Sequence, residues 1–278
     1  MDVGRTWRTP AKHDLMRNLI GKEVGVSKSK AEVRRCVWFD LTAGDAAPVD
    51  DIEWTSACSP GILANHARNV GKPTFIYAHE IKPATYDRLL TNLAANLPAI
   101  GYRQMAENIW LHGETVFLIA LNTSGADADL SVVQQGDAVF ALNDPNAITE
   151  WAMRPTFARE VGTRTWLFRS LSTLGCNPAG IKRLPAEERA GWFDLIDSQE
   201  RACPNYRDLL LCAIERDASQ WAYLMSEPTK WRSGMENTAR TAFKRHGASL
   251  TAAWWKESPE AYEEIKRTLF LTGKERAA

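Results

Sequence analysis

The stretch that decides the fold is VWFDLTAGDAAP, which runs from Val37 to Pro48. An apolar run ends at the acid Asp40, and small residues around Gly44 follow it. The apolar run predicts a buried strand, and the small residues predict a turn. Backbone can approach a ligand only where side chains are small or absent, so the turn is a candidate ligand-binding loop. An ordinary strand-to-helix connection explains the same residues equally well.

The composition is that of a globular protein. Hydrophobic residues make up 45% of the 278-residue chain, which is enough for a full core. Lysine and arginine number 34 and acidic residues also 34, so net charge does not indicate a polyanionic partner. The five cysteines show no CxxC spacing, and their odd number fits a reducing compartment. The sequence contains neither a signal-peptide pattern nor a long apolar segment, and we expect a cytoplasmic protein that does not enter membranes.

Apolar segments alternate with helix-like segments along most of the chain. The expected strands cover 35–40, 74–80, 108–114, 138–144, 164–171, 208–215 and 220–227, and the expected helices cover 12–20, 60–70, 83–97, 185–202, 230–246 and 258–271. Residues 21–30 predict a loop, and 115–123 fits either a helix or a strand. Continuous apolar strands alternating with helices predict an α/β fold, in which a mostly parallel sheet carries helices on both faces.

Four acids stand at or just past the ends of successive expected strands. They are Asp40, Glu80, Glu114 and Asp144. A single acid in such a place is commonly a helix cap or a solvated loop residue. In parallel sheets, however, ligands bind beyond the carboxyl ends of the strands, where four acids in series favour a ligand with a ribose and an adenine. One carboxylate can accept both ribose hydroxyls, and another can accept from the adenine amino group.

The turn after Asp40 distinguishes between two such cofactors. A nicotinamide dinucleotide requires a GxGxxG turn that holds its pyrophosphate against a helix N-terminus. The turn here, Thr42–Ala46, has one glycine and an additional acid, which would repel a pyrophosphate. S-adenosylmethionine has no phosphate and carries a sulfonium and an ammonium cation. The acidic turn therefore favours S-adenosylmethionine.

Several stretches resemble motifs of a known family. FDLTAGDA (39–46) is similar to the first motif of class I methyltransferases. The whole set more specifically resembles the three-Cys-motif partner proteins, a methyltransferase-like family from mobile elements and bacteria. The matching stretches are TPAKHDLMRNLI (9–20), WFDLTAG (38–44), CSPGILA (58–64), HEIKPATYDRLLTNL (79–93), NDP (143–145) and WAYLMSEPTKWRSGMENTA (221–239).

This resemblance implies a Rossmann-like sheet of seven strands with an antiparallel last hairpin, and S-adenosylmethionine as the cofactor. The residues that would border the methionine part of the cofactor are Asp40, Thr42 and Gly44. Glu80 would bind the ribose hydroxyls, and Glu114 would lie near the adenine. Asp137 is the alternative for the adenine, although it comes too soon before the next strand to leave room for a helix.

The motif that would hold the methyl acceptor is degraded. Asn143, Asp144 and Pro145 stand where amino-methylating enzymes hold the acceptor nitrogen, but Asn146 and Ala147 replace the second proline and the aromatic residue of base methyltransferases. Trp151, one helical turn further on, is a candidate stacking face for the substrate, together with Asn146, or else a partly buried helix tryptophan. The first motif departs as well, because Ala46 replaces its usual second glycine.

The charge distribution suggests partners and a domain organisation. Residues 1–35 hold nine basic and four acidic residues, so 5–35 and the helix-like 230–245 are candidate contacts for nucleic acid, although a solvated helix face is the alternative for 230–245. We expect a basic arm or helix over 1–34, a methyltransferase-like domain over 35–250 and a helical extension over 251–278. The five histidines show no HExxH or paired spacing, so we expect no metal.

The sequence therefore predicts an S-adenosylmethionine-dependent N-methyltransferase that acts on nucleic acid. In this mechanism Asp144 and the carbonyl of Asn143 accept hydrogen bonds from the acceptor amine and aim its lone pair at the methyl group. Two alternatives remain open. The chain could be a methyltransferase fold that has lost catalysis and serves as a binding module, or a subunit that acts only with a partner protein.

Overall fold

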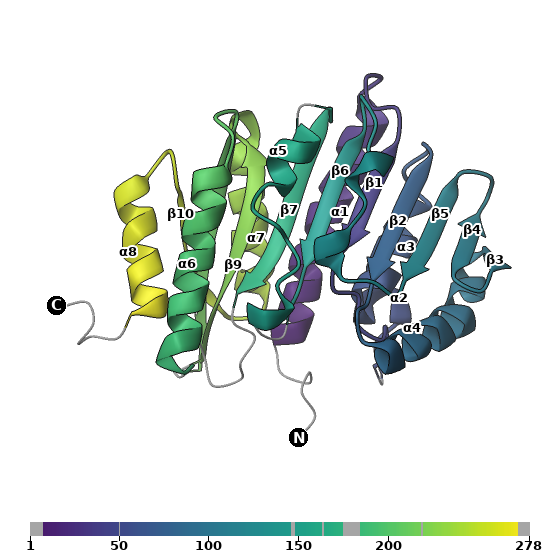
Figure 1. Ribbon diagram of the computed structural model, residues 1–278, viewed down its shortest axis with the longest axis horizontal. Helices are drawn as coiled ribbons and strands as arrows, with labels where there is room; N and C mark the ends of the chain where they lie inside the picture. Colours follow the sequence, from purple (N-terminus) through teal and green to yellow (C-terminus); the bar gives the residue numbers. More distant parts are fainter. Residues whose placement is uncertain are drawn as a thin grey trace. The chain divides into compact units, whose positions relative to one another are not determined.

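The computed structural model describes residues 8–49, 51–145, 148–162, 164–174, 184–217 and 219–271 (Figure 1). The chain forms two compact units. The described residues up to Leu142, together with Val161–Phe168, make up unit 1, and those of Asn143–Glu160 and from Arg169 onward make up unit 2. The division falls inside the stretch 35–250, which the sequence predicts as one domain.

Unit 1 is built around six strands in the order β6-β1-β2-β5-β4-β3. Their bounds are β1 (Cys36–Asp40), β2 (Thr74–His79), β3 (Tyr102–Ala106), β4 (Ile109–His112), β5 (Val116–Leu121) and β6 (Ala138–Asn143, its last residue in unit 2). β6, β1, β2 and β5 are parallel, and β4 and β3 extend the edge with antiparallel pairs. β1 lies between β2 and β6, so the direction of winding reverses there, which is where doubly wound sheets bind ligands.

The helices of unit 1 pack against one face of these strands. They are α1 (Arg8–Ser29), α2 (Trp54–Ala57), α3 (Ser59–Ala67) and α4 (Pro83–Asn96). Hydrogen bonds tie this face to the helices: Cys36 Sγ lies 3.2 Å from Ser27 Oγ of α1, and the Tyr102 hydroxyl donates to Ala64 O of α3 at 2.9 Å. Strand residues on the same face, such as Ile76 and Leu118, are fully buried.

The opposite face of unit 1 is covered differently. The segment between β5 and β6 holds two 3-10 turns, η2 (Gly125–Asp127) and η3 (Leu130–Val132), and its buried residues Leu130 and Val133 lie in the core. β2 and β5 alternate between buried and half-buried residues along their length. In Figure 1, α3 lies behind β2 and β5 and no helix is drawn in front of them. The expectation of helices on both faces therefore does not extend to these two strands.

Unit 2 contains the antiparallel part of the fold, in the order β10-β8-β9-β7. Its strands are β7 (Leu167–Leu174, its first two residues in unit 1), β8 (Arg207–Arg216), β9 (Ser219–Pro228) and β10 (Ser249–Trp254). The helices are α5 (Phe157–Gly162, ending in unit 1), α6 (Ala186–Ala202), α7 (Arg232–Arg245) and α8 (Pro259–Phe270). In Figure 1, α6 and α8 lie in front of the unit 2 strands and α7 lies behind them.

Packing within unit 2 joins its helices to the strands and to each other. Phe243 of α7 contacts the rings of Trp221 and Tyr223 on β9, with centroids 6.4 and 5.5 Å apart. On the other side, the buried Lys266 of α8 forms ion pairs with Asp197 and Glu200 of α6 at 2.7 and 3.0 Å. The antiparallel β8–β9 hairpin is the one that the sequence led us to expect.

The described residues contain ten strands rather than the expected seven. The additional ones are β3, β4 and β10, and β10 occupies the start of the stretch expected to be purely helical. The ambiguous segment 115–123 forms the strand β5. α1 continues to Ser29, through residues expected to form a loop, because Val24 and Ser27 are buried against the rest of unit 1 and packing outweighs the low helix propensity of Gly21 and Gly25. None of the described helices is long and apolar enough to cross a membrane.

Candidate functional site

The candidate cofactor site of unit 1 lies at the carboxyl ends of β1, β2 and β5. The register aligns Asp40 of β1 with Ala78 of β2, and Ala78 with Ala120 of β5, so the three strands end at one edge. The loop after β1 is bonded to its neighbours: Leu41 N donates to Leu142 O at 2.8 Å, and Ala43 N donates to His79 O at 2.9 Å. These bonds fix the loop directly above the strands.

The loop after β1 turns through left-handed backbone. Asp40 is completely buried, Thr42 is half-buried, and Gly44 has a φ of 64°. Asp45 accepts hydrogen bonds from α4, with its backbone oxygen 2.8 Å from Asn92 Nδ2. Asp40, Thr42 and Gly44 therefore lie together at the switch point, and their contact with a cofactor stays a prediction.

Ala46 keeps the conformation of the glycine that it replaces. Its φ is 50°, a left-handed value that costs a non-glycine residue about 1–2 kcal/mol. The indole Nε1 of Trp54 donates to Ala46 O at 2.9 Å, and Ala46 is 3% exposed. The methyl group is therefore packed into the protein. The substitution preserves the shape of the loop, and Trp54 holds it in place.

Glu80 follows β2 at the same edge. It is buried, its Oε1 accepts from Lys82 N at 2.8 Å, and its backbone oxygen accepts from Asn122 Nδ2 at 2.9 Å. These contacts fix both the backbone and one carboxylate oxygen. Asn122 and the turn that follows it were not identified from the sequence, because 115–123 could not be assigned to a strand and so had no defined carboxyl end.

His79 is the most deeply buried titratable nitrogen base of this edge. Its Nδ1 lies 3.0 Å from Thr123 Oγ1, and its ring lies 6.5 Å from that of Phe39. Nε2 is buried and has no hydrogen-bond partner among the described residues. Burial lowers the pKa of His79 to about 4, so the ring is neutral at pH 7. A neutral, buried imidazole with an unused nitrogen suits a contact to a polar ligand atom.

The loop after β5 crosses the loop after β1 at van der Waals contact. A Cβ added to Gly125 would lie 2.2 Å from Leu41 O and 2.7 Å from Leu41 Cα. Only glycine fits there. Ser124 Oγ accepts from Ala126 N at 3.1 Å and caps the turn η2. Gly125 therefore sets the spacing of the two loops that border the candidate cofactor site.

Two predicted adenine contacts lie at the wrong edge. β4 runs antiparallel to β5, so Glu114, which lies between them, is exposed at the amino end of β5. Asp137 precedes β6, also at the amino edge, where its carboxylate accepts from Arg35 Nε and Nη2 at 2.9 and 2.7 Å. The prediction of Glu114 is wrong because an apolar strand pattern carries no information on strand direction.

The candidate acceptor residues belong to unit 2. Thr173 of β7 donates to Asp144 Oδ1 at 2.6 Å and orients this half-buried carboxylate. Asn143 is completely buried: its Oδ1 accepts from Ala152 N at 3.2 Å, and its Nδ2 has no partner among the described residues. Pro145 is buried directly after them. The arrangement holds one carboxylate and one amide in fixed positions.

Of the two predicted substrate residues, Trp151 and Asn146, the structure describes only Trp151. The ring of Trp151 meets that of Trp192 on α6 edge to face at 5.7 Å, and its indole nitrogen donates to Met153 O. Gln199 also donates to Met153 O, at 3.0 Å. One side of Trp151 is therefore already used in packing, and its contact with substrate remains a prediction. Asn146 lies outside the described residues.

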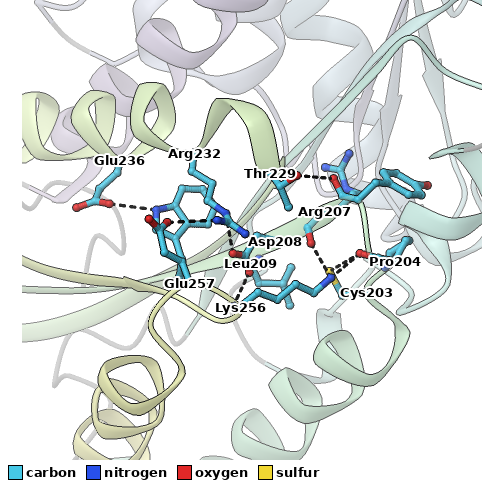
Figure 2. Close-up of polar contacts among 12 residues, drawn as sticks. Cys203, Pro204, Arg207, Asp208, Leu209, Thr229, Arg232, Glu236, Lys256 and Glu257 are labelled. Atoms are coloured by element: carbon cyan, nitrogen blue, oxygen red, sulfur yellow. Dashed lines mark hydrogen bonds and ion pairs between the residues drawn. The ribbon is translucent and has the colours of Figure 1, made fainter.

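Many cations of the two basic segments are engaged within the protein. Figure 2 shows Arg232 directed at Asp208 and Glu257, with Nε 2.8 Å from Asp208 Oδ2 and Nη1 3.5 Å from Glu257 Oε2. Arg240 pairs with Glu236 at 2.7 Å. In the first segment, Arg35 is bound to Asp137. The cations that remain exposed include Lys28, Lys30, Arg34, Lys244 and Arg245.

The strand order and the antiparallel hairpin define an α/β protein with a mixed sheet of parallel core strands and antiparallel C-terminal strands. Among the described residues no group of three or more His, Cys, Asp or Glu side chains could hold a metal ion. No protein-family model matches the chain and no curated protein does, so the resemblance to the three-Cys-motif partner proteins has no support beyond the quoted motifs.

Several solved structures resemble the arrangement at low TM-scores and low identity, and three of them follow. TrmN from Thermus thermophilus has a TM-score of 0.37 at 11% identity over 76% of this chain, which spans about half (48%) of TrmN. The rRNA methylase from Streptococcus thermophilus has a TM-score of 0.37 at 8% identity, covering 76% of this chain and 94% of that one. Human methyltransferase 10 domain containing protein has a TM-score of 0.36 at 7% identity, covering 77% and 80%.

Proposed function

We propose that the protein binds S-adenosylmethionine in unit 1 and transfers its methyl group to a nitrogen of a nucleic acid. The observation that carries this proposal is the carboxyl edge of β1 and β2. There a loop with left-handed backbone at Gly44 and Ala46 lies at the switch point of a parallel sheet, together with the two buried acids Asp40 and Glu80. The bonds of Ala43 to His79 and of Glu80 to Leu121 make this edge rigid before any ligand binds.

The chemistry of the edge fits S-adenosylmethionine better than a dinucleotide. Asp40 and Asp45 flank the loop, and a pyrophosphate there would meet two negative charges and only one glycine. A cofactor with an ammonium and a sulfonium is instead attracted to the same acids. In this assignment Asp40, Thr42 and Gly44 hold the methionine part. Glu80 accepts from the ribose hydroxyls, and His79 Nε2 supplies a further polar contact.

The acceptor amine is held in our proposal by the unit 2 residues. The bound cofactor supplies an electrophilic methyl group. Asp144 and the backbone carbonyl of Asn143 accept hydrogen bonds from the amine and so fix the direction of its lone pair. Thr173 keeps the Asp144 carboxylate in one orientation. Positioning of this kind does most of the work in a displacement that needs no protein nucleophile.

A binding module without catalysis is the second candidate. Its support is the acceptor motif, in which Pro145 is followed by Asn146 and Ala147 in place of a proline and an aromatic residue. A subunit that needs a partner protein is a variant of this candidate. Retention of a rigid Asp144 and of the left-handed backbone at Ala46 favours the enzyme.

Calorimetric titration with S-adenosylmethionine tests the cofactor assignment. Glu80→Ala removes hydrogen bonds to a charged group, about 1.5–3 kcal/mol, and lowers affinity by about 10- to 150-fold. Glu114→Ala is the matched control, because that exposed glutamate lies at the opposite edge and its loss leaves binding unchanged. Unchanged binding in Glu80→Ala contradicts the assignment.

Transfer of labelled methyl to RNA, DNA and cell-extract metabolites tests catalysis. Asp144→Ala is expected to abolish transfer while cofactor affinity stays within a few tenths of a kcal/mol, because the two groups of contacts are different. Equal transfer by both proteins excludes Asp144 from acceptor positioning. Binding of cofactor without transfer by either protein favours the binding module or the missing partner.

A further inference from the structure

The face of β2 and β5 turned away from the helices carries large, half-buried side chains. The register pairs Phe75 with Phe117 and Tyr77 with Ile119, so these four residues share that face. All four are half-buried, whereas their neighbours on the other face, Ile76 and Leu118 among them, are completely buried. The strands thus expose aromatic surface in the middle of unit 1, where a helix covers the other side (Figure 1).

This surface results from the way the chain connects β5 to β6. The connection forms the short turns η2 and η3, and its residues Leu130 and Val133 are buried in the core. It does not bury Phe75, Phe117 or Tyr77. These residues stay half-buried and contiguous, and a contiguous apolar patch that reaches the surface commonly marks an interaction site.

The rings are arranged in stacked pairs. Phe75 and Phe117 lie 5.3 Å apart with their planes within 4° of parallel, and Phe39 and Tyr77 lie 5.5 Å apart at 21°. Neighbouring parallel rings fix each other, so little side-chain entropy is lost when a further flat group stacks on them. Stacking of unpaired bases on aromatic side chains of a sheet is the common mode of single-strand recognition.

Cations border the same face at its amino end. The Arg35 guanidinium lies 5.3 Å from the centroid of the Phe75 ring and is held by Asp137 and by Val132 O, at 2.7 Å each. Four further cations of unit 1 are exposed on the adjoining segments, namely Lys30, Arg34, Arg103 and Arg164. Exposed acids of the same segments are Glu32, Glu107, Glu114, Asp127 and Asp129. Glu107 and Asp127 lie toward the carboxyl end of the sheet, so cations are in slight excess at the amino end.

We infer that this face, defined by Phe75, Tyr77, Phe117 and Ile119 and called the stacking face below, binds the unpaired bases of a single-stranded nucleic acid. Its phosphates would meet the bordering cations. A second copy of the chain is the alternative occupant, and the experiment below distinguishes it.

The inference deepens the proposed function, on which it rests for its link to methyl transfer. β2 carries the stacking residues and ends at His79, directly before Glu80, so the stacking face leads to the candidate cofactor edge within one unit. Five residues of strand separate Phe75 from Glu80, about 17 Å at the usual rise. A strand of nucleic acid lying along β2 would present one of its bases at that edge.

Fluorescence anisotropy with a labelled 12-nucleotide RNA, the same sequence as DNA, and the matching duplex tests the inference. We expect both single strands to bind at least tenfold more tightly than the duplex, and affinity to fall with salt as phosphate contacts predict. Phe75→Ala and Phe117→Ala should each weaken single-strand binding by about tenfold. Phe75→Leu, which keeps apolar contact and protects the fold, should weaken it nearly as much because the ring is lost.

Met105→Ala is the matched control, since Met105 is an exposed apolar residue of β3 and its loss should leave affinity unchanged. Equal affinity of wild type, Phe75→Leu and Phe117→Ala overturns the inference. So does a concentration-dependent dimer, detected by sedimentation, that these substitutions disperse. If RNA binding is unchanged in Phe75→Leu while methyl transfer to RNA is detected, the stacking face fails and the proposed function stands. If RNA binds as expected but neither cofactor binding nor methyl transfer is detected, the stacking face stands and the proposed function fails.

Discussion

His79 offers a test of the candidate cofactor site that requires no ligand. Its ring is 2% exposed, and burial lowers its pKa to about 4, against about 6.5 in an unfolded chain. The unfolded chain therefore takes up a proton at a pH where the folded protein does not. The stability that His79 contributes is complete above about pH 6.5 and is lost progressively as the pH falls toward 4.

The size of the effect follows from the two pKa values. Between pH 7.5 and pH 5 the unfolded ring gains its proton over about 1.5 pH units while the folded ring stays neutral. At about 1.36 kcal/mol for each unit, the free energy of unfolding falls by about 2 kcal/mol because of His79 alone. Other groups titrate in the same interval, so the effect must be measured as a difference.

Urea unfolding of wild type and His79→Gln at pH 7.5 and pH 5 isolates the contribution of His79 to the free energy of unfolding. Glutamine keeps a polar side chain of similar reach and does not titrate, so the variant should lose about 2 kcal/mol less than wild type between pH 7.5 and pH 5. Titration of the His79 ring signals by NMR checks the pKa directly. Equal losses in the two proteins, or a ring that titrates near pH 6.5, would refute a buried, neutral His79.

Two further predictions concern packing in each unit. Gly125→Ala forces a methyl group against Leu41 O, so we expect the free energy of unfolding in urea to fall by about 1–3 kcal/mol and cofactor binding to weaken. An unchanged unfolding midpoint would show that the two loops separate easily. Lys266→Met leaves Asp197 and Glu200 without their cation, and we expect a loss of about 3–5 kcal/mol at pH 7. Burial raises the pKa of Glu200, so the loss should shrink as the pH falls and Glu200 takes up a proton; a loss independent of pH would contradict this.

The sequence alone determined the parallel core and its first loop. Continuous apolar runs predicted β1, β2 and β6. β1 and β6 are buried on both faces and therefore need apolar residues at every position, whereas β2 forms as expected with one half-buried face. Asp40 and Glu80 were placed at one edge for the same reason, since parallel strands end together. The prolines at 60 and 83 marked the first turns of α3 and α4.

The tertiary structure decided what depends on contacts between distant segments. Strand direction cannot be read from an apolar pattern, and the antiparallel β4 moves Glu114 to the opposite edge. The conformation of Ala46 depends on a hydrogen bond from Trp54, which a local pattern does not reveal. The stacking face exists only because the β5–β6 connection forms short turns that leave β2 and β5 open, and no property of Phe75 or Phe117 in the sequence distinguishes them from core residues.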